Sequence, residues 1–361
     1  MRIANKLSKA STSALVLTFF LVPPALFARC PIPANGTLEV VAPAGNLIID
    51  TSGTDGVDWD VTGSQISAKQ FCNGSVVYIE GIASDNTVKP IPDWHIKVPR
   101  TVILDLVTHA GSITIGNSDS KINARTGGGD VIVGNVNGEM SIMSRAGNIR
   151  AGDIGSNADI RSSEGGNLVL GNVKGEVTAW TLAGDITISS AQKVASAITG
   201  GGNMLISRVF GSFKGKSDAG SIRILEAGSS VEATTGSGSI YLKLVPNRQS
   251  GDLHVNLEAG TGDIQLWLPT GMKADIQATA QGSQIHSDFP LVAQAQRGGF
   301  RGLPANADPG IKVPPGKVPP GLTFAAPPSS FQTTETGQRN GGGNPIHLRT
   351  TVGKVEIKLF N

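Results

Sequence analysis

The chain has 361 residues, a formal net charge of +2 at pH 7 and 16% charged residues. Such a balanced charge, with 5% aromatic residues and no basic run, argues against nucleic-acid binding, which needs clustered Lys and Arg beside stacking rings. Glycine is the outlier, with 47 residues where the usual share is about 7%. How the glycines are spaced therefore decides the interpretation.

Residues 1–28 have the layout of a secretory signal peptide. Arg2, Lys6 and Lys9 form a short cationic region, followed by an apolar region that Pro23 and Pro24 interrupt. The apolar part is short for a transmembrane helix, which needs about 20 apolar residues. A tethering anchor is the alternative. We expect an exported protein, in the periplasm, on the outer surface or outside the cell.

The segment 29–100 contains Cys30 and Cys72, the two cysteines of the chain. In an oxidising compartment two cysteines more often pair than not, so we expect a disulfide that clamps the N-terminal edge. A redox role is the weaker interpretation, because the chain has no CxxC motif. The strands expected here lack a clean period, which predicts irregular coils that cap one end of the fold.

Residues 101–297 contain a repeat in which a glycine is followed by a polar residue and then by alternating apolar residues. Nine copies begin at Gly111, Gly129, Gly147, Gly166, Gly184, Gly202, Gly220, Gly238 and Gly262. The intervals between neighbouring copies are 18, 18, 19, 18, 18, 18, 18 and 24 residues. A near-constant period of this length is typical of stacked structural units.

Each unit is interpreted as strand, turn, strand, turn, since a weaker apolar motif follows about nine residues after most of the glycines. Alternation places Ile186 and Ile188 inward and Thr187 outward. One unit cannot bury its apolar side alone, whereas stacked units can. The sequence therefore predicts an all-β fold, a parallel β-solenoid with about 18 residues per coil.

Two other repeat folds fail on register. A left-handed hexapeptide helix needs apolar residues every six positions, where this chain has Asp119 and Asn137. Calcium-binding nonapeptide rolls need the pattern G-G-x-G-x-D, whereas Asp130, Asp185 and Asp263 directly follow glycines. Neither alternative explains the spacing.

Residues 298–343 are rich in proline and glycine, and Lys312–Gly316 repeats at once as Lys317–Gly321. Proline removes ladder hydrogen bonds, so we expect an excursion that projects from the solenoid. Residues 344–361 return to a strand pattern. They are predicted to form a final coil docked on the stack.

The glycine-led units from Gly111 to Leu266 resemble a family of bacterial exported β-solenoids known as putative adhesins, whose domain is of unknown function. The segments 98–106, 268–276 and 343–349 agree with it, and the resemblance covers roughly residues 95–360. It implies an envelope or surface location and a right-handed β-helix. It brings no catalytic residue to this chain, and the Pro-rich excursion departs from the compact family pattern.

The sequence lacks the common enzyme, cofactor and metal motifs. The five histidines, His95, His109, His254, His286 and His347, have no paired ligand spacing, whereas a zinc site needs three or four converging ligands. The chain has no G-x-S-x-G elbow, and its glycine runs lack the Lys-[Ser/Thr] of a phosphate-binding loop. We expect no catalytic, cofactor-binding or metal-binding residues.

Tyr241 and Trp267 are the candidate binding residues. Both lie at outward positions of the repeat, and aromatic rings can stack on a sugar or anchor a partner. The alternative is a ring that packs on the cap or is simply half-exposed, since single exposed aromatics are ordinary.

Three functions remain open. The first is a non-enzymatic, adhesin-like envelope or surface protein that presents a β-surface for binding or scaffolding, with an envelope component, a glycan or a protein as partner. The second is a carbohydrate-active enzyme, which needs two acidic residues aligned on neighbouring coils. The third is a structural protein that associates through its solenoid ends; covered ends would instead predict a monomer.

Overall fold

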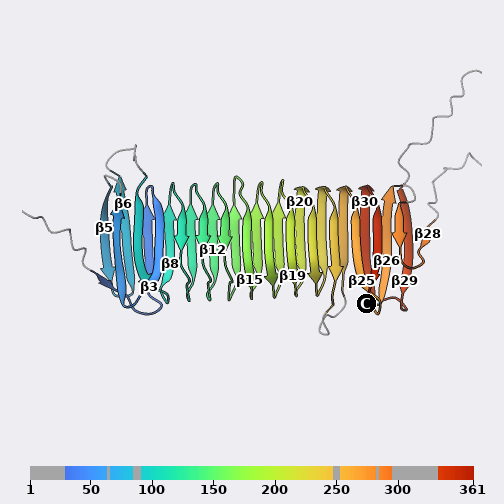
Figure 1. Cartoon of the computed structure of the whole chain (residues 1–361), viewed down its shortest axis with the longest axis horizontal. Helices are drawn as coiled ribbons and strands as arrows, with labels where there is room; N and C mark the ends of the chain where they lie inside the picture. Colours follow the sequence, from blue (N-terminus) through green and yellow to red (C-terminus); the bar gives the residue numbers. More distant parts are fainter. Residues whose placement is uncertain (1–28, 63–65, 84–90, 247–252, 282–283, 295–331) are drawn as a thin grey trace, which may run out of the picture.

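The computed structural model describes residues 29–62, 66–83, 91–246, 253–281, 284–294 and 332–361. These residues form strands and turns and no helix, so none of them offers a helix long and apolar enough to cross a membrane. The strands lie side by side in a rod (Figure 1). Two mainly parallel sheets of 15 and 16 strands run along it, which confirms the predicted all-β solenoid.

The strands fall into three groups along the chain. The N-terminal group is β1 (Cys30–Pro31), β2 (Thr37–Ala42), β3 (Asn46–Gly53), β4 (Gly56–Thr62), β5 (Ile66–Asn73), β6 (Val76–Ala83) and β7 (Asp93–Pro99). The regular group is β8 (Ile103–Thr108), β9 (Ile113–Ile115), β10 (Ile122–Thr126), β11 (Val131–Val133), β12 (Met140–Ser144), β13 (Ile149–Ala151), β14 (Ala158–Ser162), β15 (Leu168–Val173), β16 (Val177–Thr181), β17 (Ile186–Ala191), β18 (Ala195–Thr199), β19 (Met204–Val209), β20 (Phe213–Ala219), β21 (Ile222–Ala227), β22 (Val231–Ser237), β23 (Ile240–Leu244), β24 (Val255–Thr261) and β25 (Ile264–Pro269). The C-terminal group is β26 (Ala274–Gln281), β27 (Ile285–Ser287), β28 (Val292–Gln294), β29 (Gln332–Arg339), β30 (Asn344–Val352) and β31 (Val355–Phe360).

In the regular group, even-numbered strands belong to the 16-stranded sheet and odd-numbered strands to the 15-stranded sheet. Each strand pairs in parallel with the strands one coil before and after it, so that Ile186 stands beside Leu168 and Met204. Ile186 and Ile188 are fully buried, and Thr187 between them is half-exposed. The predicted inward and outward positions are confirmed, and each buried Ile contributes roughly 1.5–3 kcal/mol by leaving water.

The corner glycines permit close approach of successive coils. Gly184 has a φ of +146°, and a Cβ at this position would overlap the carbonyl oxygen of Gly166 in the preceding coil. Only glycine satisfies both conditions at low cost. The same overlap recurs at the other corner glycines of the repeat.

Two hydrogen-bond ladders tie the coils together at these corners. In the first, the polar residue after the glycine accepts a bond from the backbone amide one coil further on, as Asn167 Oδ1 does from Asp185 (2.8 Å) and Asp185 Oδ1 does from Asn203 (2.8 Å). In the second, a buried Thr or Ser hydroxyl at the end of a strand of the 16-stranded sheet donates to the corner glycine carbonyl, as Thr199 does to Gly184 (2.9 Å).

The first coil of the chain is not the outermost layer. Strands β2 and β3 pair with β8 and β9 on one side and with β6 and β7 on the other. Antiparallel strands then cover the outer layer, since β5 pairs with β6, β4 with β7, and β1 with β4. The predicted cap over 29–100 therefore includes one regular coil, because β2 and β3 follow the register of the stack.

The C-terminal end repeats this arrangement. Strands β30 and β31 lie between β24 and β25 on one side and β26 and β27 on the other, which is visible as red strands between yellow and orange ones (Figure 1). Strand β29 then covers β26 in antiparallel fashion, and β28 covers β29. The predicted final coil over 344–361 does dock on the stack, but one layer inside its end.

The predicted excursion over 298–343 extends too far toward the C-terminus. Residues 332–339 form β29, whose threonine-rich sequence suits a strand and pairs with β26 along its whole length. Residues 298–331 lie outside the described residues, and so does the predicted signal peptide over 1–28.

Candidate functional site

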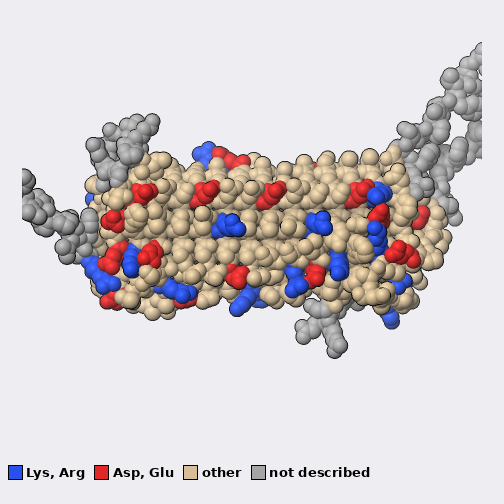
Figure 2. Space-filling model, in the orientation of Figure 1, with Lys and Arg blue, Asp and Glu red and all other residues tan. Residues whose placement is uncertain are grey.

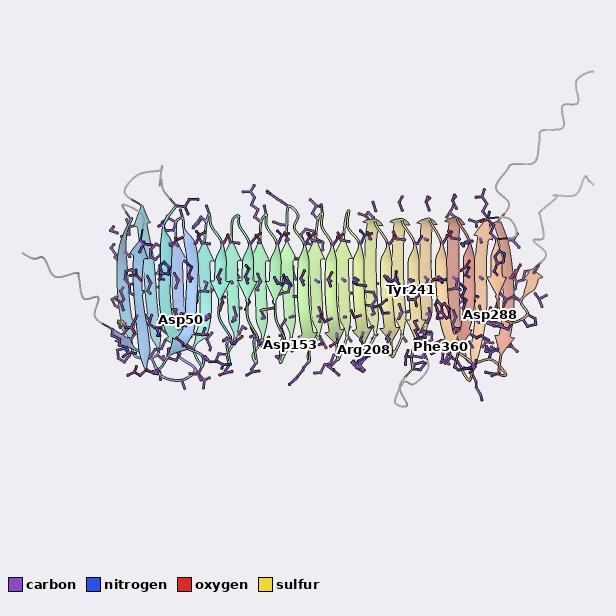
Figure 3. All side chains as sticks on the ribbon, viewed as in Figure 1. Asp50, Asp153, Arg208, Tyr241, Asp288 and Phe360 are labelled. Atoms are coloured by element: carbon purple, nitrogen blue, oxygen red, sulfur yellow. A yellow bond between two sulfur atoms is a disulfide. The ribbon has the colours of Figure 1, made fainter. Side chains whose placement is uncertain are left out.

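The outward side of the 15-stranded sheet carries both predicted binding residues near its C-terminal end. Tyr241 on β23 stands opposite Gln265 of β25, and Trp267 stands opposite Lys243 of β23. Both rings are half-buried. Figure 3 shows Tyr241 toward this end of the rod, together with Phe360. These two rings, from successive units of the repeat, thus lie on neighbouring strands of one face.

Each aromatic ring in this region has a cation beside its face. The pairs are Arg223 with Tyr241 (5.0 Å), Lys243 with Phe360 (4.6 Å) and Lys358 with Trp267 (5.4 Å), measured from the cationic atom to the ring centroid. Such contacts restrict the cationic side chains, and each contributes about 0.5–1 kcal/mol at exposed sites. The region therefore presents ordered positive charge above a layer of rings.

Glu356 is the carboxylate at the centre of these cations. Its oxygens lie 2.8 Å from Lys354 Nζ and 3.2 Å from Lys358 Nζ, and Gln265 Nε2 donates to it at 3.1 Å. Hydrogen bonds from Lys354 and then Lys358 are the main causes that lower the pKa of Glu356 to about 2. Glu356 is therefore ionised at every pH near neutrality.

A shallow groove of about 340 Å³ lies across strands β21, β23, β25 and β31. We call it the C-terminal groove, and its polar lining includes Arg223, Ser239, Tyr241, Gln265, Lys354 and Glu356. Within the described residues, Arg223 and Lys243 have no carboxylate within ion-pair distance. Their charge is open to a ligand.

The opposite end of the same face is acidic. A groove of about 330 Å³ there includes Asp50, Asp58, Asp60 and His95 in its lining. Asp50 is 3.8 Å from Lys97, and hydrogen bonds from the hydroxyl and the backbone amide of Ser52 are the main causes that lower its pKa. This group of carboxylates could not be predicted from the sequence, because residues 29–100 show no period that would align β3, β4 and β7.

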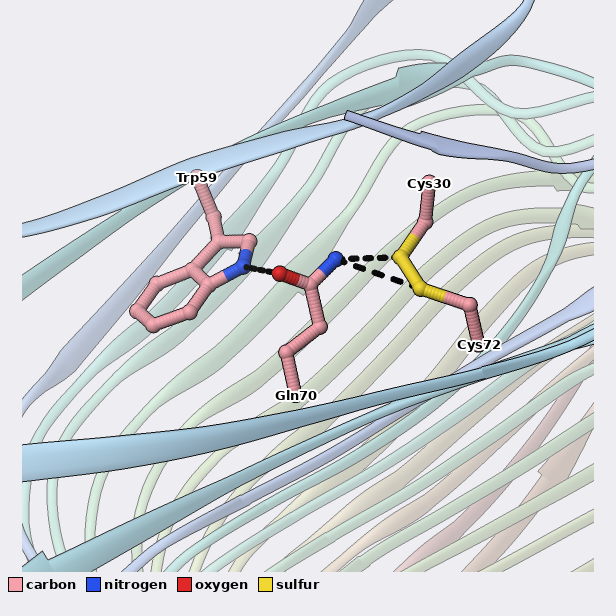
Figure 4. The surroundings of a disulfide bond; sticks show 4 residues. All are labelled: Cys30, Trp59, Gln70 and Cys72. Carbon is pink, nitrogen blue, oxygen red and sulfur yellow. Dashed lines mark hydrogen bonds between the residues drawn. A yellow bond between two sulfur atoms is a disulfide. The ribbon is translucent and has the colours of Figure 1, made fainter. Parts of the chain in front are cut away.

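The disulfide joins Cys30 to Cys72 close to this end, as the sequence predicts. The side-chain amide of Gln70 lies beside both sulfurs, and its oxygen accepts a hydrogen bond from Trp59 Nε1 at 3.0 Å (Figure 4). Trp59 in turn stacks on Trp94, with ring centroids 6.2 Å apart. The bridge therefore fastens the capping strands β1 and β5 to an aromatic pair that closes the core.

A groove of about 670 Å³ follows the corner after the 15-stranded sheet, with Asn135, Asp153, Asn172 and Arg208 in its lining. Figure 3 places Asp153 and Arg208 along the middle of the rod. The side-chain oxygens of Asn135 and Asp153 already accept hydrogen bonds from backbone amides of the next coil, with N and Oδ1 2.9 and 2.8 Å apart. Their first role is structural.

Charged side chains stand in small groups on the face that Figure 2 shows, separated by broad uncharged surface. In the part of the chain that the structure describes, no three His, Cys, Asp or Glu side chains come together in a way that could hold a metal ion. In the C-terminal groove, the Tyr241 ring, the Arg223 guanidinium and hydrogen-bonding groups lie together.

The C-terminal part of this groove could not be located from the sequence. It consists of Lys354 and Glu356, with Lys358 and Phe360 beside it, and β31 pairs with β25, 91 residues earlier in the chain. The repeat indicates that 344–361 forms a coil. It contains no signal for the layer into which that coil inserts.

No protein-family model matches this chain, and no curated protein matches it either. Among solved structures, the chain is similar to a putative cell adhesion protein from Clostridium sporogenes, with a TM-score of 0.23 and 10% identity over 92% of this chain and 98% of that one. It is also similar to a putative adhesin from Bacteroides fragilis, with a TM-score of 0.28 and 16% identity over 66% of this chain and 94% of that one.

Proposed function

We propose that this protein is an exported, non-enzymatic protein of the bacterial envelope or cell surface that presents the side of a rigid rod for binding or scaffolding. The observation that carries the proposal is the C-terminal groove, which is polar and lined by Arg223, with Lys243 beside it on β23; neither cation has a carboxylate partner among the described residues. A stiff β-stack holds these groups in fixed positions, which lowers the entropy cost of binding.

The disulfide supports the location. A Cys30–Cys72 bridge persists in the periplasm or outside the cell, whereas reducing compartments keep thiols free. The cationic and apolar pattern of residues 1–28 agrees with export.

The covered ends support a monomer. A long, open terminal strand is a template for pairing with a second chain, and short terminal strands reduce this tendency. Here the two sheets end on β1, β27 and β28, of 2, 3 and 3 residues, and on the antiparallel strand β5. Light scattering after size exclusion should give the monomer mass at every concentration. Filaments or concentration-dependent growth would instead support the structural role.

A polysaccharide-cleaving enzyme is the second candidate, and the acidic groove with Asp58, Asp60 and Asp50 favours it. Two features rank it lower. Hydrogen bonds lower the pKa of Asp50, whereas a general acid needs a raised pKa. Asp58 is about half exposed, and its Oδ1 lies 3.4 Å from Arg29 Nε, so its carboxylate is already paired. Release of reducing ends from a polysaccharide panel, abolished by Asp58→Asn or Asp60→Asn, would reverse this ranking.

The experiment that tests the binding role is a screen of the mature protein against envelope glycans, peptidoglycan fragments and surface proteins. Saturable binding to at least one class is the expected result. Absence of binding across the whole panel would leave a purely structural role.

A further inference from the structure

The C-terminal groove differs in charge from the rest of its face. Along the outward row of the 15-stranded sheet, Thr114, Ile132, Val169, Thr187 and Leu205 are uncharged, and Arg150 is the exception. Arg223 and Lys354 line the groove together with Asp263 and Glu356. Beside the groove, Lys243 and Lys358 lie two residues further along β23 and β31, and Asp288 accepts a hydrogen bond from the backbone amide of Leu359. The local net charge is therefore positive, although the whole chain is nearly neutral.

The acidic groove does not cancel this charge. Seven strands separate β3 from β23 in the sheet, which corresponds to roughly 40 Å at about 4.8 Å per strand. The Debye length in physiological salt is about 8 Å. An anion at the C-terminal groove is thus attracted by the nearby cations and is screened from Asp50 and Asp58.

Aromatic contacts, and not ion pairs, hold two of the cations in place, which leaves them available to an anionic ligand. The guanidinium of Arg223 lies over the Tyr241 ring, which limits its orientations and leaves its donors free for a carboxylate or sulfate. Lys243 is held over Phe360 in the same way. Glu356 holds Lys354 and Lys358 in place, so Arg223 and Lys243 are the cations of this region without a carboxylate partner among the described residues.

The floor between the cations suits a carbohydrate. Ser221 and Ser239 line it, and their hydroxyl oxygens accept the backbone amides of Ser239 and Asp263, so each hydroxyl can still donate to a sugar oxygen. Gln265 donates to Glu356 through Nε2, and its side-chain oxygen can accept from a sugar hydroxyl. A peptide that adds a strand needs a free strand edge, and one that docks as an amphipathic helix needs an apolar groove. Here strands β21 and β31 flank β23 and β25 on both sides, and the lining is polar.

From this combination we propose that the C-terminal groove binds an acidic polysaccharide, with Arg223 in the groove and Lys243 beside it as the main contacts for its carboxylate or sulfate groups. The proposal rests on the binding role given above and adds the ligand class and the site to it. Neutral glycans lack the group that the unpaired cations recognise.

The test compares fluorescently labelled hexasaccharides by anisotropy with the intact mature protein: a galacturonate hexamer, a heparin-derived hexamer and maltohexaose. We expect saturable binding of the galacturonate or the heparin hexamer, or of both, weakening as NaCl is raised from 50 to 300 mM, and at least tenfold weaker binding of neutral maltohexaose. Preference between the first two distinguishes carboxylate from sulfate as the recognised group.

The site is tested with a matched pair of variants. Arg223→Gln combined with Lys243→Gln should weaken binding of the acidic hexamer at least tenfold, whereas Arg150→Gln, an exposed arginine in the same outward row, should leave it unchanged. Thermal unfolding followed by circular dichroism should show that all variants remain folded. Equal losses in both variants, no loss in either, or equally tight binding of hexaglutamate would overturn the proposal.

The two proposals fail differently. If the envelope screen yields a partner whose binding is insensitive to Arg223→Gln and Lys243→Gln, the binding role stands and the acidic-polysaccharide site is wrong. If neither the screen nor any hexamer binds, both are wrong.

Discussion

The side chain of Asp263 accepts a hydrogen bond from the backbone amide of Lys354, 91 residues further along the chain, with Oδ1 and N 3.0 Å apart. In the regular coils the same bond joins residues about one repeat apart, as between Asn203 and Ser221, 18 residues apart. The inserted C-terminal coil thus continues the ladder as though it followed β25 directly. This bond also positions Lys354 and Glu356 at the C-terminal groove.

Replacing Asp263 should loosen the inserted coil. We expect Asp263→Ala to lower the free energy of unfolding by about 1–2 kcal/mol, because the amide of Lys354 loses its acceptor. Asp263→Asn keeps an oxygen at the same place and should stay close to the wild type. Urea unfolding followed by circular dichroism measures both. Equal stability of the Ala and Asn variants would show that the ladder does not hold this coil.

The regular coils could be predicted from the sequence because their information is local. The glycine at each corner and the inward residues such as Ile186 follow directly from an 18-residue spacing. The position of the inserted coils could not be predicted, because β2 and β30 fit the register of any layer, and the choice between layers depends on contacts across the whole chain. The cation–aromatic pairs of the groove, such as Lys243 with Phe360, depend on that choice.

The sequence carries a second periodic signal, of hydroxyl residues, which corresponds to the buried hydroxyl ladder. A Thr or Ser stands three or four residues before each corner glycine from Thr108 to Thr235, and its hydroxyl is buried and bonded. In an inward column of apolar residues, a repeated hydroxyl indicates a repeated acceptor, here the glycine carbonyl of the coil before. Searching for periodic polar residues at buried positions would have found it.

The corner position should tolerate no side chain. We expect Gly184→Ala to cost at least about 2 kcal/mol, because the positive φ is unfavourable for alanine and its Cβ would overlap the carbonyl of Gly166. Gly201→Ala is the control, since a Cβ there meets nothing within 4 Å, and it should change stability by less than about 0.5 kcal/mol. Similar melting temperatures of the two variants would contradict the close-approach argument.

The buried hydroxyl ladder should be measurable at a single rung. Thr199→Val keeps the shape of the side chain but removes the donor to Gly184, so the free energy of unfolding should fall by about 1–2 kcal/mol. Thr187→Val alters an outward, half-exposed threonine of the neighbouring strand β17 and serves as the control. A loss no larger than that of the control would mean that the hydroxyl bonds contribute nothing net.

The ladder also lacks one rung that can be supplied. Ala259 on β24 stands in register between Thr235 and Thr350, both of which donate to a corner glycine. We expect Ala259→Ser to stabilise the protein by about 0.5–1 kcal/mol through a new bond to the Gly238 carbonyl. Ala233→Ser on β22 buries a hydroxyl in the apolar core and should destabilise instead. Destabilisation by both serines would show that Gly238 is out of reach.

Ionisation of Glu356 should stabilise the inserted coil in a defined pH range. Its pKa in the folded protein is about 2, against 4.5 for a free glutamate, so the contribution is fully present above about pH 4.5 and is lost as the pH falls toward 2. Lys354, Lys358 and Gln265 face the carboxylate, and His286 stands beside it on β27. We expect Glu356→Gln to be less stable than the wild type by under about 1 kcal/mol at pH 6, because the ion pairs are partly exposed, and the two proteins to converge near pH 2. Urea unfolding at pH 6, 4, 3 and 2 measures the difference, and a difference that stays constant over this range would exclude Glu356 as its source.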